Sequence, residues 1–220
     1  MKKYFYTEPY PHLIIDDFFS KDIWQHIQKN VENESFWDNL CSFRKPVFSV
    51  KPHSRKSNMY ALEPQGGSEF GHIKDKLIFP YLENFWTQID IFNTLVKSDR
   101  THTRGLKHVV DLKFTTSPQT LNVHEEGEGK VATAIIYLHP SHDTGTLLYE
   151  HQYIFSKPVI WKPNRACVMV HNKGCWHGYA SFDSNKRVTI NSHLIRCLDD
   201  VLEDVPDFKP DHQYKNYWEK

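Results

Sequence analysis

The sequence lacks a net charge, because its 220 residues include 27 basic and 27 acidic side chains. Without an excess of either sign, the chain is poorly suited to coat nucleic acid or an anionic membrane. It also lacks long hydrophobic runs, since runs such as Ala134–Leu138 are far shorter than the ~20 residues of a membrane span. The N-terminal stretch turns acidic at Glu8 before an apolar signal-peptide core begins. We therefore expect a cytoplasmic protein with no membrane partner.

Cysteine is scarce as well, and its placement excludes two further classes. No paired short spacing, as a zinc ribbon or a disulfide framework requires, occurs among Cys41, Cys167, Cys175 and Cys197. Repeats and low-complexity tracts are also absent. Hydrophobic residues make up 39% of the chain and aromatic residues 14%, which is too apolar for a disordered protein. The length fits a single domain over 1–220.

The first part of the chain, 1–105, has the pattern of helices and loops. Ser20 stands at the N-cap position of a helix whose apolar residues recur at helical spacing, namely Ile23, Trp24, Ile27 and Val31. A second helical stretch covers about 73–96, and we expect Pro80 to kink or interrupt it. Between the two, the polar and basic segment 43–58 is either a solvated loop or a mobile loop that faces the substrate.

The second part, 106–200, has the alternation of short strands. Val110, Leu112 and Phe114 alternate with Asp111 and Lys113, which is a strand pattern. A nearly continuous β-rich run follows, and shorter runs come after it between turn signals, over 131–138, 146–149, 158–161, 166–171 and 188–195. Six or more short strands predict an all-β sandwich or barrel. With helices first and strands later, the whole chain is expected to be α+β, with helices on one face of a double sheet.

The segment 121–130 contains the first candidate for chemistry. His124 and Glu126 are two residues apart, so in an extended segment both project from the same face. One imidazole and one carboxylate at the same spot are two-thirds of the 2-His-1-carboxylate triad that binds Fe(II) and leaves positions open. Alone the pair is weak, because a chain with 14 histidines and 27 acidic residues contains such pairs by chance.

Two later segments add to this pair. His177 follows a predicted strand in the segment Cys175–Tyr179. The strand predicted after it is apolar on one face and polar on the other, where it carries Arg187, Thr189, Asn191 and His193. On an inner barrel strand that polar face would line a wet pocket, and the planar fork of Arg187 suits a carboxylate. A hairpin near 183–184 would bring residues 177 and 187 together, as a metal-bound dicarboxylic acid requires.

Together these segments resemble the Fe(II)/2-oxoglutarate-dependent dioxygenases, and specifically the prolyl-4-hydroxylase-like branch. That branch has a His-x-Asp, a distal His, and an Arg or Lys about ten residues later, which His124, Glu126, His177 and Arg187 match in order. The strand 133–140, the turns 144–147 and 163–166, and the N-terminal segment 11–22 also resemble the family. The likeness covers nearly the whole chain, although 36–104 matches only loosely. One departure is Glu126, which stands where the family usually has Asp.

The resemblance implies a fold and a metal site. The fold is a double-stranded β-helix, or jelly roll, with the N-terminal helices packed on one face. Fe(II) is implied to be held by His124, Glu126 and His177. Glu125 is expected to point the other way, whereas Asp143, in the turn after the long β-rich run, stays open as an alternative carboxylate ligand.

The resemblance also implies a cosubstrate site and a reaction. The far carboxylate of 2-oxoglutarate is implied to bind Arg187, with hydrogen bonds from Tyr137 and Thr189. O2 reacts at the metal, 2-oxoglutarate becomes succinate, and a substrate C–H bond is hydroxylated, with ascorbate as a supporting reductant. Two plainer readings stay open from the residues alone: Tyr137 as a core aromatic residue, and Arg187 as the ion-pair partner of a neighbouring acid.

The resemblance favours a prolyl residue of a peptide or protein as substrate, and a free amino acid or another small metabolite is the alternative. Outside this activity, the alternatives are a cupin-like metalloenzyme and a non-catalytic binding module on the same barrel. Nucleic-acid repair also stays open, because 43–58 and 100–107 are basic, although the neutral net charge argues against nucleic acid as a partner. The sequence leaves the oligomeric state undetermined.

Overall fold

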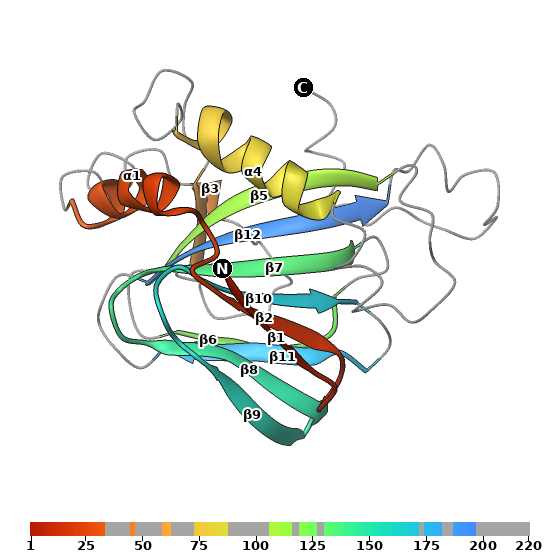
Figure 1. Ribbon diagram of the computed structural model, residues 1–220. Coiled ribbons are helices and arrows are strands. Elements are labelled where there is room, and N and C mark those ends of the chain that lie inside the picture. The colour runs from red at the N-terminus through yellow and green to blue at the C-terminus, as the bar shows by residue number, and fades with distance from the viewer. Residues whose placement is uncertain are drawn as a thin grey trace.

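The computed structural model describes residues 1–33, 45–46, 59–62, 73–87, 106–115, 119–126, 130–171, 174–181 and 187–196. These residues form two antiparallel sheets, and Figure 1 shows the smaller one beneath the larger one. The larger sheet has eight strands in the order β1 (Lys2–Tyr6), β2 (His12–Asp16), β10 (Arg165–Val170), β7 (Lys130–His139), β12 (Arg187–Arg196), β5 (Leu106–Thr115), β4 (Met59–Leu62) and β3 (Lys45–Pro46). The smaller sheet has four, in the order β6 (Gln119–His124), β11 (Trp176–Ser181), β8 (Thr144–His151) and β9 (Ile154–Ile160).

The central strand β7 shows why the larger sheet is buried on both faces. Its β-branched and small residues suit a strand, and alternate side chains point to opposite faces. Ala134 and Ile136 belong to the core under the helices, whereas Tyr137 belongs to a second core that it shares with Leu148 and Val159 of the smaller sheet. The second core therefore fills the space between the two sheets, and the inner face of β7 looks into it.

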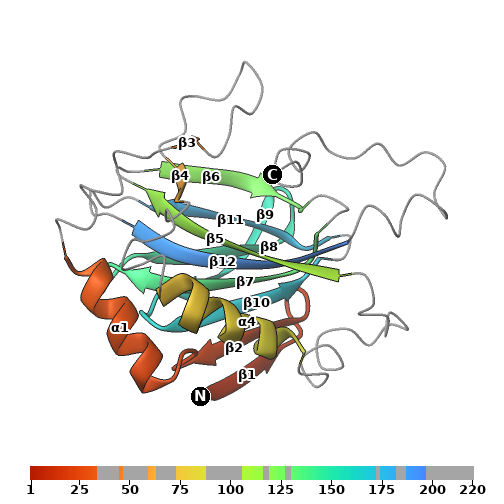
Figure 2. The same ribbon diagram turned by 90° about the horizontal axis from the view of Figure 1, so that it is seen from above.

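Helices cover the outer face of the larger sheet. Figure 2 shows α1 (Lys21–Val31) and α4 (Phe79–Trp86) lying across β7, β10 and β2. Both helices bury apolar side chains in the first core, among them Ile27 and Leu82, which are fully buried. With one face of the sheet closed in this way, the inner face is the place where polar side chains can line a site.

The start of each helix differs in detail from its sequence pattern. Ser20 is the N-cap of α1, but its side chain makes no capping hydrogen bond. The π-helical segment η1 (Lys74–Ile78) runs directly into α4, where Pro80 lies within the first two positions. Pro80 therefore lies where the π-helical backbone changes to α-helix, and it removes one backbone hydrogen bond at that change without ending the helical stretch. The part of the expected helix beyond Thr87 lies outside the described residues.

The strands expected after residue 106 are present, and the structure is largely antiparallel β, as a jelly roll requires. The division into a helix-rich 1–105 and a barrel core 106–200 stays a prediction, but the description of 1–105 as helix and loop was incomplete. In that part β1 to β4 extend the larger sheet at both of its edges. Of the basic segment 43–58, the structure describes only Lys45–Pro46 as β3.

One close approach in the smaller sheet requires a glycine. A Cβ atom on Gly145, at the start of β8, would lie 1.9 Å from the carbonyl oxygen of Val159 in β9. Only glycine permits this backbone contact. Separately, no helix in the described parts of the chain is both long and apolar enough to cross a membrane.

Candidate metal and cosubstrate site

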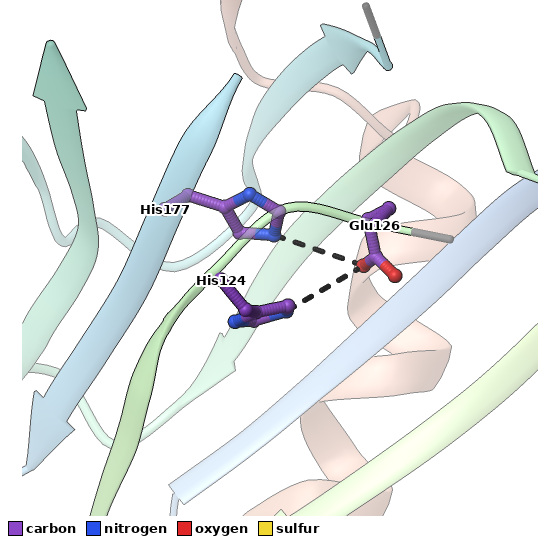
Figure 3. A group of neighbouring side chains, drawn as sticks. All are labelled: His124, Glu126 and His177. Carbon is purple, nitrogen blue, oxygen red and sulfur yellow. Dashed lines mark ion pairs between the residues drawn. The ribbon is translucent and has the colours of Figure 1, made fainter. Parts of the chain in front are cut away.

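The register of two strands brings the first two predicted metal ligands together. His124 ends β6 and lies directly opposite His177 of β11 in the antiparallel pairing. Their ring centres are 4.6 Å apart as a result. Glu126 follows two residues after His124 and turns its carboxylate toward both rings, as Figure 3 shows. Its Oε1 lies 4.0 Å from Nε2 of His124 and 3.7 Å from Nε2 of His177.

The donor set fits a divalent metal ion. The ligand atoms of His124, Glu126 and His177 all lie within 4.8 Å of one another, and this is the only such group among the described residues. Two imidazoles and one carboxylate form the set that non-haem Fe(II) oxygenases use, with further positions open. The side chains of His177 and Glu126 are 4% and 14% exposed and that of His124 is 34% exposed. The group is therefore enclosed on the His177 side and reached by solvent at His124.

Neighbouring groups prepare these side chains for metal binding. Burial alone would raise the pKa of Glu126, but the neighbouring imidazole of His177 and the charge of Lys130 outweigh it and hold that pKa well below its usual range. The carboxylate is therefore ionised, as a ligand must be. Nδ1 of His177 lies 3.2 Å from the carbonyl oxygen of Cys175, so we assign the ring proton to Nδ1. This tautomer leaves Nε2 free to bind a metal.

Lys130 is a further residue beside the candidate ligands, and it did not stand out in the sequence. Its Nζ lies 2.7 Å from Oε2 of Glu126, and both side chains are largely buried. One carboxylate oxygen is therefore held by Lys130 while the other faces the two histidines. Glu126 and Lys130 are four residues apart, a spacing that predicts a contact only on a helix. Because neither residue lies in a helix, their spacing did not predict this ion pair.

The other two acidic residues considered as ligands lie elsewhere. The carboxylate of Glu125 accepts a hydrogen bond from the backbone N–H of Gly174, in the turn before β11, and so points away from the histidines. Asp143 lies beside Arg187, with its Oδ2 3.3 Å from Nε of the guanidinium. The structure therefore brings Glu126 to the histidines and places Asp143 in the predicted cosubstrate site.

Arg187 is enclosed at the first position of β12. Its guanidinium lies over the ring of Tyr179 at 4.1 Å and over that of Trp161 at 5.0 Å. Burial lowers the pKa of Arg187, an effect that Tyr179 and Asp143 counteract, and a guanidinium remains charged in any case. Although Nε is close to Asp143, it makes no hydrogen bond and is fully buried. A buried cation with an unused donor fits the far carboxylate of a dicarboxylic acid.

Tyr137 and Thr189 lie opposite each other on β7 and β12, which places both on the inner face. The Tyr137 hydroxyl donates to Oγ1 of Thr146 at 2.8 Å and accepts from the Thr146 N–H at 3.0 Å. Thr189 donates to Oδ1 of Asn191 at 3.1 Å. Burial raises the pKa of Tyr137, so it stays protonated. Tyr137 is also a core residue, so the plainer reading of it and its predicted role are both compatible with its position.

A chain of hydrogen bonds lies beside the metal-ligand group. Oγ1 of Thr133 is 2.5 Å from Nε2 of His171 and 2.8 Å from Nδ1 of His193. His171 stacks on His177 with ring centres 6.0 Å apart, and Nε2 of His193 lies 3.6 Å from Oδ2 of Asp111. Burial lowers the pKa of His171 to about 3 and that of His193 well below its usual value. Both imidazoles are therefore neutral, polar walls of the site.

No protein-family model matches the sequence, and no curated protein matches it either. Solved structures do match the fold. A viral collagen prolyl hydroxylase from Paramecium bursaria Chlorella virus-1, in complex with 2-oxoglutarate, superposes with a TM-score of 0.50 at 12% identity, over 85% of this chain and 96% of that one. A Trichoplax adhaerens prolyl hydroxylase in complex with a hypoxia-inducible-factor peptide gives 0.54 at 14% identity, over 88% and 87%. A rice dioxygenase for auxin oxidation gives 0.56 at 12%, over 86% and 74%.

The chain shares its fold with prolyl hydroxylases and a dioxygenase. The fold extends over most of this chain and of each of these proteins, so the likeness concerns the whole domain rather than one hairpin. At 12% to 14% identity it establishes the architecture alone. The chemistry must therefore be argued from the side chains of this chain.

Proposed function

We propose that this protein is an Fe(II)- and 2-oxoglutarate-dependent dioxygenase that hydroxylates an unactivated C–H bond. The proposal rests above all on one observation, the convergence of the His124, Glu126 and His177 ligand atoms within 4.8 Å. Two features support it: Arg187 is a buried cation at the first residue of β12, and the fold is that of known hydroxylases. A cupin-like enzyme or a plain binding barrel has no need for such an arginine.

Each residue has a defined task in this proposal. When bound, Fe(II) with 2-oxoglutarate and O2 supplies the oxidation that yields succinate, CO2 and a hydroxylated product. Nε2 of His124, Nε2 of His177 and the ionised Glu126 hold the metal. The enclosing side chains keep water away from the reacting centre, since His177 and Tyr137 are buried.

Arg187 would bind the far carboxylate of 2-oxoglutarate. Asp143 lies at its Nε side, and none of the described residues accepts a hydrogen bond from its terminal nitrogens. The guanidinium can therefore present its fork to a carboxylate while Asp143 fixes its position. The stacked rings of Tyr179 and Trp161 hold the guanidinium plane in place. Tyr137 and Thr189 would add hydrogen bonds from the same inner face.

For the substrate we propose a prolyl residue of a peptide or protein, which is supported by the fold of a hydroxylase solved with a peptide. A free amino acid or another small metabolite is the second candidate. It is favoured by the polar inner wall of Asp111, His171 and His193, which offers hydrogen-bonding groups to a small polar molecule. The fold likeness to a dioxygenase for auxin oxidation also supports it.

Turnover tests the proposal. Anaerobic protein with Fe(II) and 2-oxoglutarate should develop a weak visible charge-transfer band near the green, and after air is admitted with ascorbate it should release succinate slowly even without substrate. His177→Ala should show neither the band nor the succinate, because it removes one ligand. Absence of both signals from the unaltered protein under fresh Fe(II) would refute the oxygenase. Proline-containing peptides and free amino acids, assayed for one added oxygen atom, then distinguish the two substrate classes.

A further inference from the structure

Lys113 of β5 lies in the same row as two residues of the predicted cosubstrate site. In the larger sheet Lys113 pairs with Thr189 of β12, and Thr189 pairs with Tyr137 of β7. Side chains of directly paired residues project to the same face of a sheet. The three side chains therefore form one row across three adjacent strands on the inner face, between the two sheets.

The ammonium of Lys113 is enclosed but lacks a partner. Its side chain is partly exposed, yet burial lowers its pKa, and the like charge of Lys130 acts in the same direction. Partial exposure and a lowered pKa are compatible here, because protein surrounds the side chain of Lys113 while water still reaches part of it. Within the described residues, the ammonium makes no hydrogen bond and no ion pair. An enclosed cation without a partner costs stability, so a ligand that neutralises it is expected.

The other charges of the inner face already have neighbours. Lys130 holds Glu126 at 2.7 Å, and Arg187 lies 3.3 Å from Asp143. Asp111 faces His193, with 3.6 Å between the carboxylate oxygen and Nε2. Among the described residues, Lys113 is the cation of this face that forms no ion pair, and the carboxylates of Asp111 and Glu126 attract it only from a distance.

Lys113 also lies between the two ends of the predicted cosubstrate site. Its ammonium is within electrostatic reach of Glu126, at the metal-ligand group, and of Arg187, at the carboxylate anchor. A dicarboxylate that extends from the metal-ligand group to Arg187 would pass this row of side chains. A second cation beside that path would neutralise the second negative charge of such a molecule.

We propose that Lys113 binds a carboxylate inside the barrel, as a second cationic contact besides Arg187. This inference rests on the proposed function, because the occupant it assigns is 2-oxoglutarate. A carboxylate on the hydroxylated substrate has the same chemistry, and the experiment below separates the two sources.

Lys113→Met tests the assignment, because methionine keeps the length and the apolar contacts of the stem while it removes the charge. With Mn(II) in place of the oxidisable Fe(II), calorimetric titration should show 2-oxoglutarate binding weakened by about ten- to a hundredfold, the loss expected for a charge-assisted contact. The ligand-free variant should unfold at a higher temperature than the unaltered protein, because an unpaired enclosed cation is gone. Lys76→Met, at an exposed lysine of η1, is the matched control and should change neither quantity.

The outcomes separate this inference from the proposed function. If the unaltered protein does not bind 2-oxoglutarate with Mn(II), the proposed function is wrong and this inference falls with it. If the unaltered protein binds 2-oxoglutarate but Lys113→Met binds it equally well, the carboxylate at Lys113 is not that of 2-oxoglutarate. In that case acetate is titrated into both proteins saturated with Mn(II) and 2-oxoglutarate: acetate binding lost in the variant supports a substrate carboxylate, and equal acetate binding overturns the assignment. A lower unfolding temperature together with unchanged 2-oxoglutarate binding would make Lys113 structural.

Discussion

At the scale of single residues, the most informative side chain is Glu126. It is one methylene longer than the aspartate usual in the dioxygenases that the sequence resembles, and the structure gives each of its carboxylate oxygens a neighbour. Oε2 is held by Lys130 at 2.7 Å, which directs Oε1 to both histidines. The longer ligand is therefore fixed by a cation next to it. Such outer contacts orient metal ligands and influence affinity strongly.

A comparison of two carboxylate variants tests which acid binds the metal. Glu126→Ala should abolish Mn(II) binding, measured by electron paramagnetic resonance titration, because it removes a ligand. Asp143→Ala should leave Mn(II) binding intact and weaken 2-oxoglutarate binding, because it removes the group that fixes Arg187. Glu126→Asp should bind Mn(II) more weakly than the unaltered protein, since the shorter side chain cannot reach both Lys130 and the histidines. The reverse pattern, with Asp143→Ala unable to bind Mn(II), would require a different ligand set.

The residues of the candidate site were singled out from the sequence, but their contacts could not be predicted from it. His124, Glu126, His177 and Arg187 stood out by type and order. The sequence could not reveal that Asp143 lies against Arg187, because Asp143 sits in a turn, where strand alternation does not fix the direction of a side chain. Lys113 was identified as the polar member of an alternating strand, but its lack of a partner depends on three strands that are far apart in the sequence.

At the scale of elements, strands with a strong pattern were predicted and weakly patterned ones were missed. The strands β7 and β12 have long runs of β-branched residues, so their position was clear from the sequence. The sequence did not predict that β1 and β2 form a hairpin. Every residue of β1 is exposed, so its sequence has no alternation of buried apolar and exposed polar residues. Its position depends on pairing with β2, and β2 in turn pairs with β10.

One ion pair joins β2 to the start of β10. Arg165 donates from Nε to Oδ1 of Asp16 at 2.6 Å and from its terminal nitrogen to Oδ2 at 3.1 Å. This hydrogen bonding lowers the pKa of Asp16, although burial opposes the effect. A carboxyl whose folded-state pKa is depressed stabilises the fold above its unfolded pKa. That contribution is lost as the pH falls through the folded-state pKa.

Asp16→Asn should therefore destabilise the protein in a pH-dependent way. The free energy of unfolding in urea should fall by about 1–3 kcal/mol at neutral pH, because a bidentate charged contact is lost. The difference from the unaltered protein should begin to shrink below about pH 4, where this carboxyl is protonated in the unfolded chain, and disappear below the lower folded-state pKa of Asp16. Asp17→Asn is the control, since Asp17 is 60% exposed and only 3.9 Å from Lys162. An equal loss of stability at neutral and acidic pH would show that the charge of Asp16 is unimportant.

At the scale of the whole molecule, the candidate site lies between the two sheets, because the helices cover the opposite face of the larger sheet. The helices α1 and α4 close the outer face of the larger sheet, and the smaller sheet faces its inner side (Figure 1, Figure 2). The candidate metal ligands lie on β11 and at or just after the end of β6 in the smaller sheet, and the side chains proposed to bind a carboxylate lie on the larger sheet. A cosubstrate that touches both groups would bridge the two sheets.

The order of motifs along the chain suggested the double-sheet fold, but β11 and β12 do not pair as the expected hairpin near 183–184, because β11 lies in the smaller sheet and β12 in the larger one. The order of motifs did not suffice for the substrate, since the outer segments that would contact a substrate carry no pattern that predicts their position. His193 belongs to the polar strand face that the sequence predicted, but its neighbours Asp111 and His171 became apparent only from the contacts in the structure.

The most direct test of the account is a crystal structure of the protein soaked with Mn(II) and 2-oxoglutarate without O2. The account predicts an anomalous-scattering peak for Mn(II) between His124, Glu126 and His177. It also predicts the far carboxylate of 2-oxoglutarate on the guanidinium of Arg187. A metal bound elsewhere, or a triad without metal and an Arg187 still paired only with Asp143 at saturating 2-oxoglutarate, would contradict it.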